Sequence, residues 1–140
     1  MRLIQMLSNN ELREHILVLY ENLKPYNGDC QLDICFDENN LNSEGLFVFS
    51  NHQGYHYLYS ERGEETTHKV TDDIFEISFW IFQPVTSSIA FEFAAKNIEQ
   101  KKSRRQIAFE KQLEYLDILG ENFRKRGEIE IDEILKVYPY

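Results

Sequence analysis

The sequence predicts an α+β fold in a single domain of residues 1–140. We expect an N-terminal helix, a short antiparallel β-meander of three to four strands, and a C-terminal half of three to four helices packed on it. Apolar residues recur at helical spacing near the N-terminus, alternate with polar ones between residues 31 and 60, and return to helical spacing from residue 74 onward. A chain of 140 residues can bury one sizeable core.

The first helix is predicted over residues 9–23. Ser8 and Glu11 have the spacing of a capping box, in which each side chain bonds the other residue's backbone. Leucine and isoleucine then recur every three or four positions. Lys24-Pro25 ends the helix, because the residue before proline is pushed out of the helical region.

The strands follow a period of two. Leu32, Ile34 and Phe36 alternate with polar neighbours and predict the first strand. The polar loop DENNLNSEG follows, and the remaining strands are predicted over residues 46–50, 55–60 and 66–70. A glycine at position 63 permits a sharp exit from the third strand.

The C-terminal half is predicted to be helical. Residues 74–82 are apolar nearly all round, which indicates a buried helix. Pro84 is expected to kink or break it, with helix resuming over 88–96. A long helix is predicted over 103–126 and closed by Gly127, and a last helix precedes Pro139.

The net charge of −9 limits the partners that the chain can bind. So acidic a surface disfavours nucleic acid and anionic membranes and favours a basic partner. The charged residues between Pro25 and Glu61 are all acidic: Asp29, Asp33, Asp37, Glu38, Glu44 and Glu61. This segment is either a solvated rim or an acidic docking face.

Cysteine usage and hydropathy predict a soluble, cytoplasmic protein. Cys30 and Cys35 would point to opposite faces of a strand, so we expect both to be reduced. The apolar run at the N-terminus is too short for a signal peptide. Unbroken apolar stretches such as 79–82 are far too short to span a membrane.

Signals for catalysis are sparse, and we predict neither an enzyme nor a cofactor. No P-loop, Rossmann glycine pattern, G-x-S-x-G or H-E-x-x-H is present. One alternative is a small metal-binding module or hydrolase that uses His52, His56 and His68, although their spacing matches no established zinc motif. Another is an oligomeric adaptor that pairs with a second copy through its tyrosines.

Two further features lie in the stretch YHYLYSERG, residues 55–63. Tyr55, Tyr57 and Tyr59 share one face of a strand, where they either fill the core or form a binding strip. Glu61 ends that strand, and we expect it to form an ion pair with Arg104 or Arg105 that joins the two halves of the chain.

The order of these motifs resembles immunity protein family sixty-three of the bacterial polymorphic-toxin systems. The matching segments are Tyr-His-Tyr, Glu61-Arg62-Gly63, Thr71-Asp72, Phe79-Trp80-Ile81-Phe82, Val85-Thr86, the S-R-R-x-x-x-F run from Ser103 to Phe109, Gln112-Leu113-Glu114, Glu130-Ile131 and Ile134-Leu135. The resemblance covers residues 55–140 well and the N-terminal part loosely. Phe123 stands where the family has a tryptophan.

The resemblance implies an antitoxin that binds a cognate toxin domain, delivered through contact-dependent inhibition or made by its own cell. Such a protein blocks the active site of its toxin in the cytoplasm, and many of these toxins are nucleases with basic grooves. We expect a monomer or weak homodimer, with Glu61, Arg104 and Arg105 serving the scaffold. The predicted toxin contacts are Asp33, Asp37, Glu38, Glu44, Tyr55, Tyr57 and Tyr59.

Overall fold

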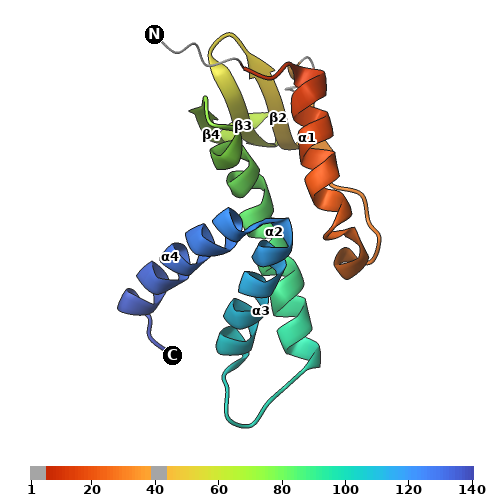
Figure 1. The fold of residues 1–140 in the computed structure, drawn as a ribbon. Coiled ribbons are helices and arrows are strands. Elements are labelled where there is room, and N and C mark those ends of the chain that lie inside the picture. Colours follow the sequence, from red (N-terminus) through yellow and green to blue (C-terminus); the bar gives the residue numbers. More distant parts are fainter. Residues whose placement is uncertain (1–5, 39–43) are drawn as a thin grey trace. The chain divides into compact units, whose positions relative to one another are not determined.

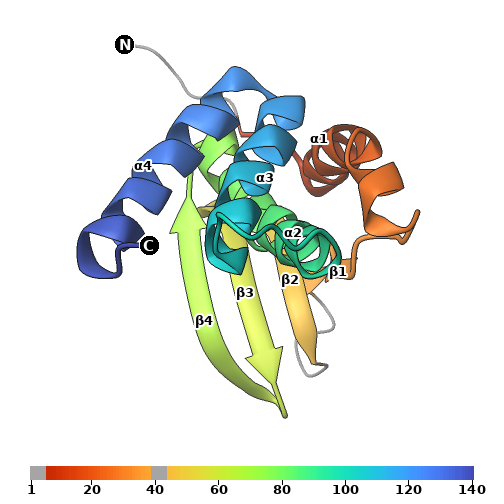
Figure 2. The same ribbon diagram turned by 90° about the horizontal axis from the view of Figure 1, so that it is seen from below.

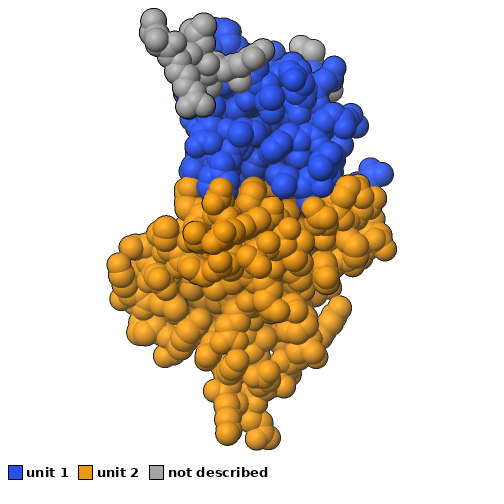
Figure 3. All heavy atoms as spheres, viewed as in Figure 1, with its two compact units in different colours: residues 1–20, 31–80 blue, residues 21–30, 81–140 orange. Residues whose placement is uncertain are grey.

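A computed structural model of the chain describes residues 6–38 and 44–140. The centre of the predicted polar loop and the first residues of the N-terminal apolar run lie outside the described residues. The chain divides into two compact units, residues 1–20 with 31–80 and residues 21–30 with 81–140 (Figure 3). The element order confirms the α+β prediction: one helix, a four-stranded sheet, then three helices (Figure 1).

Helix α1 (Asn9–Glu21) begins at the predicted capping box. The Ser8 N–H donates to Glu11 Oε1 at 3.0 Å, and the Glu11 N–H donates to Ser8 Oγ at 3.2 Å. Leu12 and Ile16 are fully buried on its inner face. The chain then tightens into the 3₁₀ turn η1 (Lys24–Asn27), where Pro25 cannot continue an α-helix.

The sheet has the order β1-β2-β3-β4 (Figure 2). Strands β2 (Gly45–Asn51), β3 (Gly54–Glu61) and β4 (Glu64–Thr71) form the predicted antiparallel meander. Strand β1 (Ile34–Cys35) differs from the prediction, because it is short and runs parallel to β2. The sheet is therefore mixed. A connection as long as the one between β1 and β2 does not force the hairpin pairing that a tight turn imposes.

Both hairpin turns are fixed by local chemistry. Asn51 Oδ1 accepts the Gln53 N–H at 2.9 Å in the β2–β3 turn. Arg62 and Gly63 have φ of 55° and 81° in the β3–β4 turn. Positive φ at both central residues is the geometry of a type I′ turn, which matches the twist of the two strands.

The two faces of the sheet are covered differently. Tyr55 and Ser50 are cross-strand partners, and both bond the backbone of Leu7 just before α1. Tyr57 lies on the same face and meets the ring of Trp80 at 6.3 Å. The opposite face carries an apolar cluster of Phe47, Phe49 and Leu58.

Helix α2 (Ile74–Lys96) is continuous through Pro84, so the predicted break is wrong. Proline removes only one backbone donor, and burial on both sides of position 84 holds the helix together. By length and composition alone α2 could cross a membrane, although a core helix of a globular protein has the same properties. Fewer than half of the residues in its most apolar window are buried.

Helices α3 (Arg104–Leu119) and α4 (Glu121–Val137) replace the predicted helix 103–126. The break falls at Gly120, whose φ of 153° is a conformation that other residues rarely adopt. Gly127 does not close a helix but lies inside α4. A Cβ at Gly127 would come within 2.4 Å of Leu116 Cδ1, so this glycine permits close packing of α3 on α4.

Candidate interaction surface

The predicted acidic residues are exposed: Asp33, Asp37, Glu38 and Glu44. Glu44 also has a structural contact, because its Oε1 accepts the Arg62 N–H at 3.1 Å and so braces the β3–β4 turn. The backbone carbonyl of Asp37 lies 3.5 Å from Cys35 Sγ. Glu44 is therefore both an exposed acid and a structural residue of this turn.

The three tyrosines of β3 become more exposed along the strand. Tyr55 is buried, and its hydroxyl accepts the Leu7 N–H at 2.8 Å. Tyr57 is half-buried, and burial raises its pKa. The Lys69 ammonium lies 4.9 Å from the Tyr57 ring centre and 4.5 Å from that of Trp80. Tyr59 is 43% exposed, so it is the tyrosine of the three that offers a ring to a partner.

Two of the three predicted histidines come together across β3 and β4. His56 Nδ1 lies 2.9 Å from His68 Nε2, and His56 Nε2 lies 2.8 Å from Asn51 Oδ1. The buried His56 ring stacks on Phe49 with 4.6 Å between ring centres. His52 is exposed in the β2–β3 turn. His52 interacts with His56 electrostatically, but no hydrogen bond joins the two rings among the described residues.

The neighbours of His56 determine which nitrogen carries its proton. Asn51 presents its oxygen to the ring, since the same oxygen accepts the Gln53 N–H. His56 Nε2 must then be the donor, which leaves Nδ1 as an acceptor facing His68. Burial lowers the pKa of His56, as do the charges of His68 and His52, while Glu38 opposes them.

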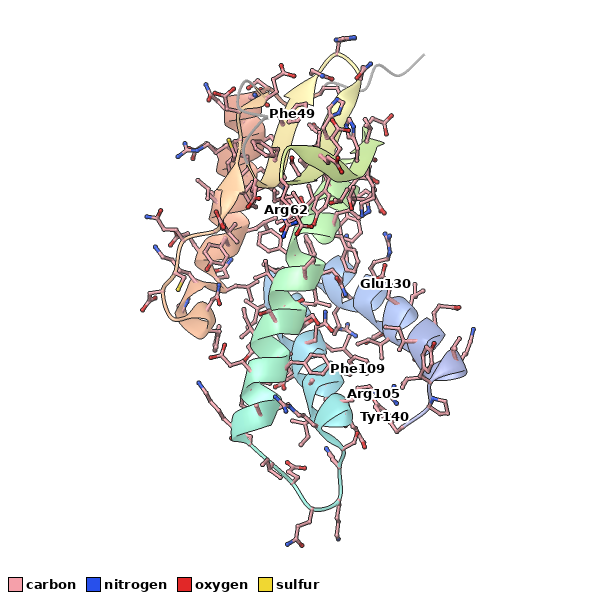
Figure 4. The ribbon with its side chains drawn as sticks, turned by 180° about the vertical axis from the view of Figure 1, so that it is seen from behind. Phe49, Arg62, Arg105, Phe109, Glu130 and Tyr140 are labelled. Carbon is pink, nitrogen blue, oxygen red and sulfur yellow. The ribbon has the colours of Figure 1, made fainter. Side chains whose placement is uncertain are left out.

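The residues of the predicted ion pair are placed in different surroundings. Glu61 is the last residue of β3 and lies opposite Glu64. The Arg105 guanidinium lies over the rings of Phe109 and Tyr140, at 5.8 and 5.4 Å from their centres (Figure 4). Arg104 is exposed. Glu61 and the arginines belong to different units, so their pairing stays a prediction.

The run Ser103-Arg104-Arg105-x-x-x-Phe109 has a local structural explanation. Ser103 is the N-cap of α3, and its Oγ accepts the Gln106 N–H at 3.1 Å. Arg105 and Phe109 are four positions apart, which places the cation beside the ring on one helix face. These residues stabilise the start of α3.

A buried polar contact in the second unit was missed from the sequence. Gln112 Nε2 donates to both Gln83 O and Thr86 Oγ1 at 3.2 Å. The Thr86 hydroxyl in turn donates to Phe82 O at 2.8 Å. The signal was available, because a glutamine in the middle of an apolar helix face needs a partner once it is buried. This contact fixes α3 against α2 within residues 81–140.

The described part of the chain contains no set of three side chains that could bind a metal ion together. Residues 6–38 and 44–140 contain no cluster of three or more His, Cys, Asp or Glu side chains arranged to hold an ion. The pair of His56 and His68 supplies two nitrogens only. The three-histidine arrangement considered from the sequence is thus reduced to two residues within bonding distance.

Comparison with known proteins gives one match. The family model described as Immunity protein 63 matches residues 51–133, which is more than half of the chain. The match begins at the β2–β3 turn and extends into α4. No curated protein and no solved structure matches the chain.

Proposed function

The chain belongs to the Immunity protein 63 family, and on this basis we propose that it binds a cognate toxin domain and neutralises it. The family match is the observation that carries the proposal. An immunity protein acts by stoichiometric binding and needs no catalytic group of its own. The toxin, delivered by contact or made in the same cell, meets it in the cytoplasm.

The charge of the chain supports the kind of toxin that we propose. A nuclease binds an anionic substrate in a basic groove, and a protein of net charge −9 can occupy such a groove. Complementary charge also speeds association and suppresses wrong partners. We therefore propose that the chain occludes the active site of a nuclease.

The proposed contact surface is Asp33, Asp37 and Glu38, together with the exposed ring of Tyr59. Glu44 contributes charge beside them but also holds a turn. Tyr55 supports the surface from within the core, since it is buried. The acids would provide attraction, and the aromatic ring would provide apolar contact area.

Co-purification and growth protection test the proposal together. The chain is expressed with a candidate toxin domain, chosen from toxin-like proteins encoded near its own gene, and one of the two carries a tag. We expect a one-to-one complex that survives high salt and growth that is restored. The triple variant Asp33→Lys, Asp37→Lys and Glu38→Lys should weaken binding by about tenfold or more, mainly through slower association.

A matched control separates the acidic surface from net charge. The variant Glu99→Lys, Glu114→Lys and Asp132→Lys makes the same change of charge at exposed positions elsewhere. It should bind far better than the first variant. Equal binding by the two variants would move the contact surface away from Asp33–Glu38, whereas no complex with the unmodified chain would count against that toxin as the partner.

A further inference from the structure

A small cavity lies among the three helices of the second unit. It has a volume of about 80 Å³, and α2, α3 and α4 all contribute to its lining. Phe109 of α3 and Glu130 of α4, both labelled in Figure 4, line it together with Gln112, Ile131 and Ile134. An apolar cavity of about 150 Å³ admits a benzene ring, so this smaller cavity admits only a slender group.

The inner wall of the cavity carries a hydrogen-bond acceptor without a donor. Gln112 is 4% exposed, and its Nε2 donates to Gln83 O and Thr86 Oγ1. The Thr86 hydroxyl hydrogen is directed at backbone oxygens, so both of these partners accept and the amide cannot be turned over. Gln112 Oε1 accepts no hydrogen bond among the described residues. Among those residues the sealed side-chain atom without a partner is Ser60 Oγ, so the Gln112 oxygen is not sealed and opens into the cavity.

The mouth of the cavity is partly acidic and partly apolar. The side chain of Glu130 is 41% exposed and Ile134 is 39% exposed, so these two residues form the rim. Phe109 and Ile131 are buried and form apolar walls. Arg126 Nε lies 3.7 Å from Glu130 Oε1, which is longer than a hydrogen bond, so this carboxylate oxygen can accept one from an incoming group.

We propose that this cavity receives the side chain of a lysine from a partner protein. Lysine carries three N–H donors and no acceptor at the end of a slender aliphatic stem. The stem packs against Phe109 and Ile131, and the ammonium donates to Gln112 Oε1 and the Glu130 carboxylate. Lysine fits better than arginine, because its ammonium is compact whereas a guanidinium is a planar fork.

Charge favours the same occupant. The chain has a net charge of −9, which attracts a basic partner. A neutral aliphatic side chain would fill the space but would leave the Gln112 oxygen without a donor, which costs binding free energy. The proposal stands on the cavity alone and does not depend on the toxin contacts proposed above.

The test is binding of small probes to the full chain, followed through the NMR signals of the Gln112 side-chain amide. The probes are N-acetyl-lysine N-methylamide, which is a blocked lysine, and n-butylammonium, which is the lysine side chain alone. We expect each to bind at one site per chain with a Kd on the order of millimolar, as suits ligands of few atoms. N-acetyl-norleucine N-methylamide should bind at least about tenfold more weakly, because it has no ammonium.

Two variants locate the cation. Glu130→Gln should weaken binding of both cationic probes by about tenfold, because it removes the charge of the acceptor, and it should fold because Glu130 is partly exposed. Asp132→Asn is the matched control, since it removes an exposed carboxylate from the same helix outside the cavity lining. It should leave binding unchanged.

Three results would overturn the proposal. The Gln112 signals could show no saturable shift with either cation in the millimolar range, which would leave the cavity to water. Equal binding of the norleucine probe would contradict recognition of the ammonium. Binding of n-butylammonium without binding of the blocked lysine would show that only free amines enter, and not a side chain of a protein.

Discussion

Replacing Gln112 by leucine should lower the free energy of unfolding, because the change removes two buried hydrogen bonds. Gln112 is 4% exposed and its Nε2 makes two hydrogen bonds, to Gln83 O and Thr86 Oγ1. Each such bond contributes about 1 kcal/mol net. The Thr86 hydroxyl hydrogen lies between Phe82 O and Gln83 O, at Oγ1–O distances of 2.8 and 3.1 Å, so Gln83 O keeps a partner when the amide is removed. We expect a loss of about 1–2 kcal/mol in the free energy of unfolding.

A double-mutant cycle with Thr86→Val isolates the bond between the two side chains. Thr86→Val alone should cost about 1 kcal/mol, because it leaves one buried donor of Gln112 with a single acceptor. The double variant should cost about 1 kcal/mol less than the sum of the two, since both polar partners are then gone.

The assay is urea unfolding followed by the fluorescence of Trp80, with m-values compared between variants. Gln106→Leu on the same helix is the control. Its amide makes a longer bond of 3.4 Å to Glu110, and we expect a change within about 0.5 kcal/mol. Strict additivity of Gln112→Leu and Thr86→Val would refute the inferred contact.

Three further predictions concern stability. Gly127→Ala should lower the free energy of unfolding by about 1–2 kcal/mol, because overpacking against Leu116 exceeds the gain in helix propensity. Thermal unfolding measures this loss, and a stabilised variant would refute the close approach of Gly127 to Leu116. Arg62→Asn should raise the free energy of unfolding, measured with denaturant, by about 0.5–1 kcal/mol, because Asn-Gly suits a type I′ turn better than Arg-Gly. A loss of stability would contradict this and show that the Arg62 side chain has a role of its own. Burial lowers the pKa of His15 from its ordinary value of 6.5, so below pH 6.5 the unfolded chain binds more protons than the folded chain and the free energy of unfolding falls. His15→Gln should reduce that fall. An identical dependence of stability on pH in the two proteins would contradict the prediction.

The parts of the fold that local sequence determines were predicted well. Ser8 and Glu11 form a capping box because both partners lie within one helical turn. The turn at Arg62-Gly63 likewise depends on residues that are adjacent in the chain. The pairing of β3 with β4 was also predictable, because a two-residue turn sets the register of the two strands that it joins.

The errors arose where a distant residue decides the outcome. Gly120 and Gly127 look alike in the sequence, and only contact with Leu116 assigns Gly127 to packing. Pro84 was expected to kink or break the helix, and the break is wrong because α2 runs on through this position. The direction of β1 depends on a long connection that local patterns do not describe.

The residues of the candidate site were likewise predictable only where local sequence determines their position. The sequence placed His56 and His68 on neighbouring strands, but their diagonal register and the orientation of Asn51 come only from the three-dimensional arrangement. Alternation put the tyrosines on one face without telling which of them is exposed. The toxin contacts stay predictions, because the chemistry that defines them belongs to a partner.

Inhibition of the toxin by the purified chain is the measurement that tests the account most directly. The candidate toxin domain that co-purifies with the chain is assayed on DNA and RNA while the chain is titrated in. We predict that cleavage falls to zero at one equivalent and that the stoichiometric end point persists at high salt. Full cleavage in the presence of a formed complex would contradict occlusion of the active site, and full cleavage without a complex would contradict the pairing itself.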